Sequence, residues 1–216
     1  MKIDAVIFDV DGLMVDSENL WLNSMLKAGK ELGINITKKF LLKLVGLRTD
    51  LYNKELKKQY GEDFDVAKFR EVAQEHFDRV EDGGKMKVKK GVFEILNVLK
   101  KKRIPMAIAS MSKLNVVKYR LQQVGIDLSY FDYITGGDMV ENAKPDPEIY
   151  IKSSQALGVN KENIIAFEDS PAGVESAFKA GIKVIHIPDM KKPSDQTKEY
   201  SYKILKNLKK AMKLFE

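Results

Sequence analysis

Two aspartates separated by one residue occur in Asp9-Val10-Asp11-Gly12, at the end of an apolar run that is typical of a buried strand. Because Gly12 lets the chain turn at once, both carboxylates can face one site from a loop. A carboxylate can attack an anionic phosphoryl group only when a cation neutralises their repulsion. The second carboxyl group can give a proton to the departing oxygen and later take one from water. Taken alone, the pair is equally consistent with an acidic strand end that caps a helix or stays solvated.

A second acidic pair, Glu168-Asp169, ends another apolar run and precedes Ser170-Pro171. Together with Asp9, these acids can surround a hard cation, and a set of oxygen ligands suits magnesium rather than zinc. The chain has two histidines and no cysteine, which disfavours a nitrogen or sulfur metal site. The alternative role for Glu168 and Asp169 is to cap the helix that Pro171 begins.

Two further segments offer groups for phosphate oxygens. Ser110-Met111-Ser112 follows an apolar run and supplies a hydroxyl and backbone N–H groups ahead of a predicted helix. Lys144, followed by Pro145, can supply a fixed positive charge from a strand-to-helix loop. The ordinary alternatives are a helix N-cap for Ser112 and a surface lysine beside a turn for Lys144. The shared position of all these groups at the ends of predicted strands favours a single site.

The elements that must position these residues alternate between strand and helix patterns. Short apolar runs predict buried parallel strands at residues 5–10, 105–110, 164–168 and 183–187, with weaker ones at 133–135 and 202–205. Helical periodicities lie between them, and one predicted helix runs from Pro171 through Phe178, with Gly181 closing it. This alternation predicts an α/β fold with a doubly wound parallel sheet, which binds ligands at the carboxyl ends of its strands.

Residues 16–86 break this alternation, because helical spacing is clear there and no convincing strand pattern appears. Asp16 or Ser17 can cap the first helix of this segment. We therefore predict a helical cap domain over residues 16–86, inserted into a core domain of residues 1–15 and 87–216. An insertion directly after the first strand would lie over the ligand-binding edge of the sheet, as a lid.

Taken together, these segments resemble the haloacid dehalogenase-like (HAD) hydrolase superfamily over almost the whole chain. The matching segments occur in the family's order: Phe8-Asp9-Val10-Asp11-Gly12-Leu13, Ala109-Ser110, Lys144-Pro145-Asp146-Pro147 and Phe167-Glu168-Asp169-Ser170-Pro171-Ala172-Gly173-Val174. The helical insertion is similar to the cap of the β-phosphoglucomutase-like branch. The resemblance implies a Rossmann-like core and a phosphoric monoester hydrolase.

The resemblance also implies a role for each matched acidic residue. Asp9 becomes the phosphoaspartate and ligates magnesium. Asp11 is the acid and base, and it ligates the ion through its backbone carbonyl. Asp169 is a metal ligand, with Glu168 as a direct or water-mediated partner. The implied cofactor is Mg²⁺.

The same resemblance implies that Ser110 and Lys144 hold the phosphoryl oxygens. Gly12 and Met111 belong to the same predicted phosphate-binding set. The family pattern further predicts a cis bond between Lys144 and Pro145.

The resemblance narrows the reaction as well. Dehalogenases and phosphonate-cleaving members lack an acid at the position of Asp11, because they protonate no alkoxide, so Asp11 favours phosphate esters. A β-phosphoglucomutase would carry a histidine where an ungapped comparison places Trp21, which disfavours a phosphomutase but leaves it as the alternative. A signalling receiver domain, which also uses a phosphorylated aspartate, is much shorter and has no helical insertion after its first strand.

Substrate choice is predicted to depend on the cap. Its segments Ser17-Glu18-Asn19-Leu20-Trp21 and Gly46-Leu47-Arg48-Thr49-Asp50 look like those of sugar-phosphate and hexitol-phosphate phosphatases. The candidates for binding the non-phosphate end of the substrate are Glu18, Trp21, Arg48 and Thr49. The equally weighted alternative is that Trp21 belongs to the core of the cap and that Arg48 is a solvated charge.

Composition argues against other classes of partner. The net charge is +6, but the lysines are spread out and many alternate with acidic residues, which does not favour nucleic-acid binding. The densest basic segment, residues 203–213, interleaves with apolar residues and predicts a terminal amphipathic helix. With no membrane-spanning run, no signal-peptide pattern and no cysteine, we expect a cytoplasmic monomer that acts on a small phosphorylated metabolite.

Overall fold

The computed structural model describes residues 2–45 and 49–216, and the chain divides into two compact units. One unit comprises Met1–Asp16 and Lys87–Glu216, and the other comprises Ser17–Met86. The first unit is built around a β-sheet, and the described residues of the second form helices and loops.

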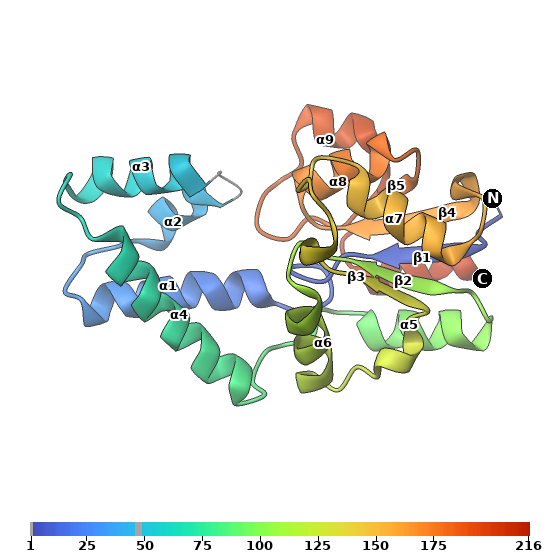
Figure 1. Cartoon of the computed structure of the whole chain (residues 1–216), viewed down its shortest axis with the longest axis horizontal. Helices are drawn as coiled ribbons and strands as arrows, with labels where there is room; N and C mark the ends of the chain where they lie inside the picture. Colours follow the sequence, from blue (N-terminus) through green and yellow to red (C-terminus); the bar gives the residue numbers. More distant parts are fainter. Residues whose placement is uncertain (1, 46–48) are drawn as a thin grey trace. The chain divides into compact units, whose positions relative to one another are not determined.

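The sheet of the first unit has six parallel strands in the order β3-β2-β1-β4-β5-β6 (Figure 1). Every residue of β1, β2 and β4 is buried, as expected for a parallel sheet that helices cover on both faces. The α/β class and the doubly wound parallel sheet predicted from the sequence are confirmed. The strands are β1 Ala5–Phe8, β2 Met106–Ala109, β3 Tyr133–Thr135, β4 Ile164–Glu168, β5 Lys183–His186 and β6 Ser201–Ile204.

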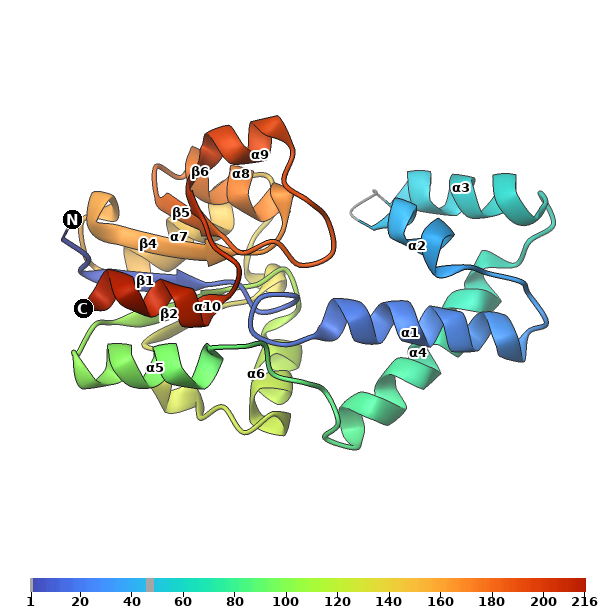
Figure 2. The same cartoon turned by 180° about the vertical axis from the view of Figure 1, so that it is seen from behind.

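Helices pack on both faces of this sheet (Figures 1 and 2). On one face, α7 Glu148–Leu157 and α8 Pro171–Lys179 share a hydrophobic cluster with strand residues. On the other face, α5 Val92–Lys101 packs against α10 Leu208–Ala211. The remaining helices of this unit are α6 Leu114–Gln123, α9 Asp195–Tyr200 and the short 3₁₀ helices η1 Leu128–Tyr130, η2 Gly137–Met139, η3 Lys161–Asn163 and η4 Met212–Phe215.

The register of the three central strands aligns their carboxyl ends. Phe8 of β1 pairs with Ile108 of β2 on one side and with Phe167 of β4 on the other. The N–H of Asp9 then donates to the carbonyl of Phe167 at 3.0 Å, which continues the ladder by one step. Residues that directly follow β1, β2 and β4 are therefore brought to the same edge of the sheet.

The predicted C-terminal helix over residues 203–213 is wrong in its first half. β6 runs to Ile204 and pairs with β5, so the edge strand predicted at residues 202–205 is the correct interpretation. Sheet pairing satisfies the backbone groups of this segment and outweighs the helical spacing of its apolar residues. The helix begins only at Leu208, where the side chain of Asn207 caps its first turn.

The second unit contains the helices α1 Ser17–Glu31, α2 Lys38–Leu44, α3 Thr49–Tyr60 and α4 Val66–Asp82. α1 and α4 form its principal helix pair. His76 of α4 lies 2.8 Å from the carboxylate of Glu31 on α1, and the Trp21 and Phe77 rings join the same two helices. The side chains of Thr37 and Asp65 cap α2 and α4. These contacts make the inserted segment a folded unit with its own apolar core.

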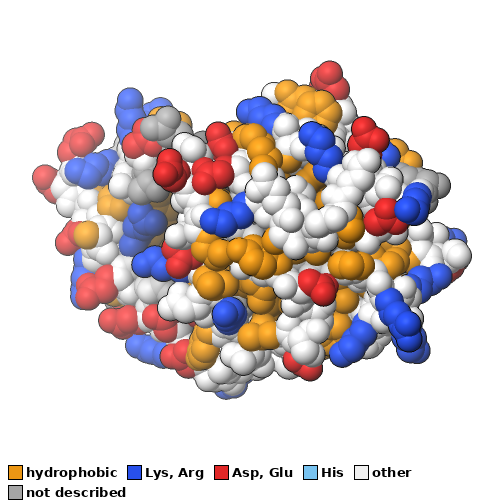
Figure 3. Space-filling view, turned by 45° about the vertical axis from the view of Figure 1, so that its right-hand side comes forward, with side chains coloured by type: hydrophobic (Ala, Val, Ile, Leu, Met, Phe, Trp, Pro, Cys, Tyr) orange, Lys and Arg blue, Asp and Glu red, His pale blue; other side chains and the backbone are white. Residues whose placement is uncertain are grey.

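Charged side chains of both signs are interspersed on the face shown in Figure 3. The excess of lysine and arginine is therefore not gathered into one basic patch on this face. Among the described residues, no helix combines the length and apolar character needed to cross a bilayer.

Candidate active site

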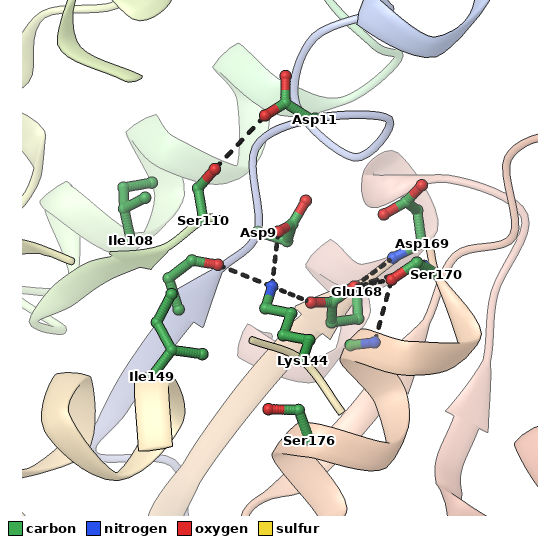
Figure 4. Close-up of polar contacts among 12 residues, drawn as sticks. Asp9, Asp11, Ile108, Ser110, Lys144, Ile149, Glu168, Asp169, Ser170 and Ser176 are labelled. Carbon is green, nitrogen blue, oxygen red and sulfur yellow. Dashed lines mark hydrogen bonds and ion pairs between the residues drawn. The ribbon is translucent and has the colours of Figure 1, made fainter. Parts of the chain in front are cut away.

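Asp9 is the first residue after β1, and its side chain is only 9% exposed. Its Oδ1 accepts a hydrogen bond from Lys144 Nζ at 2.8 Å (Figure 4). Burial is the largest cause that raises the pKa of Asp9 well above its usual range, and Lys144 opposes that rise. The charges of Glu168 and Asp11 raise the pKa of Asp9 further. A cation beside Asp9 would therefore favour its carboxylate form.

Three carboxylates gather at this edge of the sheet. One oxygen from each of Asp9, Glu168 and Asp169 lies within 4.8 Å of the other two. Glu168 is the last residue of β4 and is fully buried. The three groups offer oxygen donors only, which is the ligand chemistry that magnesium prefers. The acidic pair predicted from the sequence thus lies beside Asp9.

The loop that follows Glu168 encloses this carboxylate. Ser170 donates through its hydroxyl to Glu168 Oε2 at 3.2 Å, and it is also the residue that caps α8. A Cβ atom built on Gly173 would lie 2.0 Å from the Glu168 carboxylate, so only a glycine allows this close approach. Glu168 Oε2 also accepts from the N–H of Asp169 at 3.2 Å. Ser170, and neither Glu168 nor Asp169, is the N-cap of α8, so the alternative role of these two acids as helix caps is wrong.

Lys144 connects Asp9 to Glu168. Its Nζ donates to Asp9 Oδ1 at 2.8 Å, to Glu168 Oε1 at 2.5 Å and to the carbonyl of Ala109 at 2.9 Å. Burial tends to lower the pKa of Lys144, but the charges of Asp9 and Glu168 outweigh it, so the net shift is upward and the side chain stays an ammonium. The bond from Lys144 to Pro145 is cis, as predicted. The side chain is 6% exposed, so the alternative of a surface lysine is wrong.

Tyr150 is a residue of this site that the sequence analysis missed. Its hydroxyl donates to Glu168 Oε1 at 2.7 Å, and Lys144 Nζ lies 5.0 Å from the centre of its ring. Burial, followed by the charge of Glu168, raises the pKa of Tyr150 well above its usual value, so the hydroxyl remains a donor. A signal was present in the sequence, since Tyr150 and Ser153 place hydroxyl groups one helical turn apart among apolar residues of α7.

If magnesium binds beside Glu168, as the sequence predicts, changing Tyr150 to phenylalanine is expected to weaken activation by magnesium about 10-fold, because loss of a hydrogen bond to a ligand residue typically has an effect of this size. The measurement is turnover of p-nitrophenyl phosphate as a function of magnesium concentration. Tyr202→Phe, which removes the hydroxyl of an exposed tyrosine, serves as the matched control. An unchanged magnesium dependence in Tyr150→Phe would contradict a role for this hydroxyl in holding Glu168.

Asp11 has different partners from the other acids. Its Oδ1 accepts from Arg120 at 2.8 Å, and its Oδ2 accepts from Ser112 Oγ at 2.7 Å and from Ser110 Oγ at 3.4 Å. Gly12 follows with φ +85°, and its N–H donates to the carbonyl of Val15 at 2.9 Å, so the chain turns sharply here. The backbone contact of Asp11 with a metal ion stays a prediction.

Ser110 directly follows β2 and is buried. Its hydroxyl also accepts from the N–H of Ser112 at 3.1 Å, while Met111 between them is 37% exposed. Ser112 is not the N-cap that the alternative interpretation expected. The carboxylate of Asp138 accepts from the N–H of Leu114 at the start of α6, which leaves the Ser112 hydroxyl for Asp11.

Two more functional neighbours were missed from the sequence. Arg120 lies one helical turn after the buried Val117 on α6, a charged residue beside an apolar face. His186, at the end of β5, approaches the backbone carbonyl of Asp169 through Nε2 at 2.9 Å. Burial lowers the pKa of His186, which favours a neutral ring that donates to this carbonyl. No motif in the sequence connects His186 with Asp169.

The four cap candidates are only partly described. Trp21 is half-buried and packs edge-on against Phe77, with 5.9 Å between the ring centroids, so it contributes to the core of the helical unit. Glu18 lies in the first turn of α1 and is also half-buried. Arg48 lies outside the described residues, and Thr49 is described only as the first residue of α3. Their contact with a substrate stays a prediction.

Comparisons with known proteins agree with this architecture. The family described as haloacid dehalogenase-like hydrolase matches residues 6–187. A phosphorylated carbohydrates phosphatase of Thermotoga maritima is 33% identical over 184 residues, which cover 85% of this chain and 84% of the relative. The 6-phosphogluconate phosphatase of Escherichia coli is 26% identical over 187 residues, which cover 86% of this chain and 82% of that relative. A crystal structure from Thermotoga maritima, described as a candidate β-phosphoglucomutase, superimposes with a TM-score of 0.82 at 28% identity and covers 98% of both chains.

Proposed function

Because the chain belongs to the haloacid dehalogenase-like hydrolase family, we propose that it is a magnesium-dependent phosphatase that acts through a phosphoaspartate on Asp9. The proposed substrate is a small phosphate monoester of a sugar or polyol. The observation that carries the proposal is a buried Asp9 that bonds to Lys144 and lies beside the carboxylates of Glu168 and Asp169.

Magnesium fits the groups present at this site. The oxygen-only donor set favours a hard cation there, because three carboxylates offer oxygen ligands within 4.8 Å of one another. Asp9 and Asp169 would hold the ion, with Glu168 as a direct or water-mediated partner and the backbone carbonyl of Asp11 as a further ligand. When bound, the ion supplies positive charge that lets a carboxylate approach an anionic phosphoryl group.

The residues of the chain then divide the reaction into two steps. In the first, an oxygen of Asp9 bonds to phosphorus, the bond from phosphorus to the ester oxygen breaks, and Asp11 gives that oxygen a proton. In the second, water attacks the phosphorus of the acyl phosphate and gives its proton to Asp11, which releases phosphate and restores Asp9. Lys144 and Ser110 stabilise the charge on the phosphoryl oxygens in both steps.

The substrate class is supported by the relatives. The similar proteins of Thermotoga maritima and Escherichia coli are named for phosphorylated carbohydrates and for 6-phosphogluconate. We place the binding of the non-phosphate end in the helical cap, with Glu18, Trp21, Arg48 and Thr49 as the proposed contacts. Arginine and threonine side chains there would hydrogen-bond to hydroxyl groups or to a second anionic group.

A phosphomutase is the second candidate, because one similar structure is described as a candidate β-phosphoglucomutase. It differs from the phosphatase only in the acceptor of the phosphoryl group, which would be a second sugar hydroxyl in place of water. Dependence on a sugar bisphosphate with no net release of phosphate would favour the mutase.

The test of the proposed function is a screen of phosphorylated sugars, polyols and nucleotides for phosphate release, with and without magnesium. We expect release from one or more sugar or polyol phosphates, and its loss when a chelator removes the ion. Activity that survives chelation would contradict the magnesium assignment. Preference for nucleotides would contradict the substrate class.

A further inference from the structure

Arg120 has no part in the two steps above, yet it contacts the proposed acid and base directly. Its guanidinium NH1 donates to Asp11 Oδ1 at 2.8 Å and to Ser112 Oγ at 3.1 Å. The side chain is 14% exposed, and it reaches Asp11 from the seventh residue of α6. Arg120 therefore places a positive charge next to the carboxylate that is proposed to transfer the proton.

We propose that Arg120 is a positioning residue that orients the Asp11 carboxyl group for proton transfer to the leaving oxygen. The proposal rests on the proposed function, since it assigns a purpose to Asp11 that only a phosphoryl-transfer reaction requires. Its action is on the first step, in which the bond to the leaving group breaks.

The contacts of Asp11 fix its side chain at two points. Arg120 holds Oδ1 and Ser112 holds Oδ2, with Ser110 as a more distant donor to the same oxygen. Because the two oxygens are held by different elements, rotation of the carboxyl plane would break at least one contact. Charge-assisted bonds from a guanidinium are the stronger and more directional kind. Without them, a side chain that is 22% exposed on a loop would be free to turn toward water.

The carboxylate of Asp11 lies outside the cluster of acids that would hold the ion. Among the described residues, the cluster of three carboxylates consists of Asp9, Glu168 and Asp169, and it does not include Asp11. Figure 4 shows the Asp11 carboxyl directed to Ser110 while the Asp9 carboxyl is directed to Lys144. Each of the two proposed catalytic acids therefore has its own cationic partner. Lys144 contacts Asp9, the proposed nucleophile, and Arg120 contacts Asp11, the proposed acid and base.

The network also allows a purely structural interpretation, in which Arg120 only braces the loop after β1. The two interpretations predict different substrate dependences. A positioning residue for proton transfer is needed most when the leaving group is a poor one, because a good leaving group departs without a proton. A structural brace supports the whole site and affects all esters alike.

The test compares kcat/KM for a series of substituted phenyl phosphates, from phenyl phosphate to p-nitrophenyl phosphate, at saturating magnesium. This ratio covers the steps up to departure of the phenol, so the later hydrolysis of the phosphoaspartate does not enter. Arg120→Met keeps the apolar stem of the side chain. It is expected to lower kcat/KM about 10-fold for phenyl phosphate and less than about 2-fold for p-nitrophenyl phosphate. The larger loss is a fraction of the rate acceleration that general acid catalysis typically supplies. Arg120→Lys is expected to restore part of the loss, and the exposed Lys118→Met, on the same helix, to match the wild type.

An equal loss for all esters, or no loss for any, would overturn the proposal. Thermal melting checks that Arg120→Met is folded. If Arg120→Met does not fold, Ser112→Ala is measured in its place. This substitution removes the hydrogen bond to Asp11 Oδ2 and is expected to lower kcat/KM more for phenyl phosphate than for p-nitrophenyl phosphate. Failure of the proposed function would be seen separately, as a wild-type enzyme without turnover or an Asp9→Asn variant with full turnover.

Discussion

Changing Asp9 to asparagine is expected to abolish turnover of p-nitrophenyl phosphate in the presence of magnesium, by a factor of about 10⁴ or more, as for the loss of other catalytic nucleophiles. An amide has no anionic oxygen to attack phosphorus, and it cannot form the acyl phosphate. It also removes one negative ligand from the acidic cluster with Glu168 and Asp169. The measurement is release of p-nitrophenol, followed by absorbance, with enzyme at high concentration to define the residual rate.

Asp63→Asn is the matched control for this variant, since it makes the same chemical change at an exposed position of the helical unit and is expected to retain wild-type turnover. Mass spectrometry of acid-quenched wild-type enzyme should find a phosphoryl adduct on the peptide that contains Asp9, and none in Asp9→Asn. Wild-type rates in Asp9→Asn, or an adduct on another residue, would refute the assignment of the nucleophile.

Changing Lys144 to methionine is expected to reduce both activity and stability. The ammonium separates two buried carboxylates, those of Asp9 and Glu168, and its removal leaves them facing each other without a counter-charge. Breaking a buried ion pair from one side typically costs about 3–5 kcal/mol of unfolding free energy. Turnover should fall about 100-fold to 1,000-fold, as for the loss of one preorganised charge that stabilises a transition state. Urea denaturation without magnesium, together with steady-state kinetics, measures both effects.

Magnesium provides an internal check on this prediction. An ion held by Asp9 and Asp169, with Glu168 as a direct or water-mediated partner, would restore part of the missing positive charge, so Lys144→Met should gain more stability from added magnesium than the wild type does. Lys101→Met, at an exposed position of α5, is expected to change neither quantity. Equal stability of Lys144→Met and the wild type without magnesium would show that the ammonium is not the main counter-charge of this cluster.

Asp11, the proposed acid and base, lies in a hydrogen-bond network of its own. Three side chains hold its carboxylate, those of Ser110 and Ser112 after β2 and that of Arg120 on α6. The substitutions at Arg120 and Ser112 therefore test a second layer of the site, separate from the cluster around Asp9. Substitutions at Asp9 and Lys144 test the proposed nucleophile and its counter-charge, and substitutions at Arg120 test the proposed proton transfer.

The sequence by itself determined the class of fold and the residues at its strand ends. Apolar runs such as those of β1 and β4 are buried in any parallel sheet, and the acids that follow them must lie at its carboxyl edge. Glycine and proline added local information, because Gly12 allows a turn with positive φ and Pro171 can occupy only the first turn of a helix. These features are local, so a single sequence carries them.

Tertiary structure alone decided which of these side chains contact one another. Tyr150, Arg120 and His186 come from three different elements. Tyr150 and Arg120 contact the carboxylates of Glu168 and Asp11, and His186 contacts the backbone carbonyl of Asp169. The pairing of residues 201–204 with β5 likewise overrode a helical spacing that was real in the sequence. Contacts of this kind depend on strand register and helix packing, which many distant residues set together, so no short pattern records them.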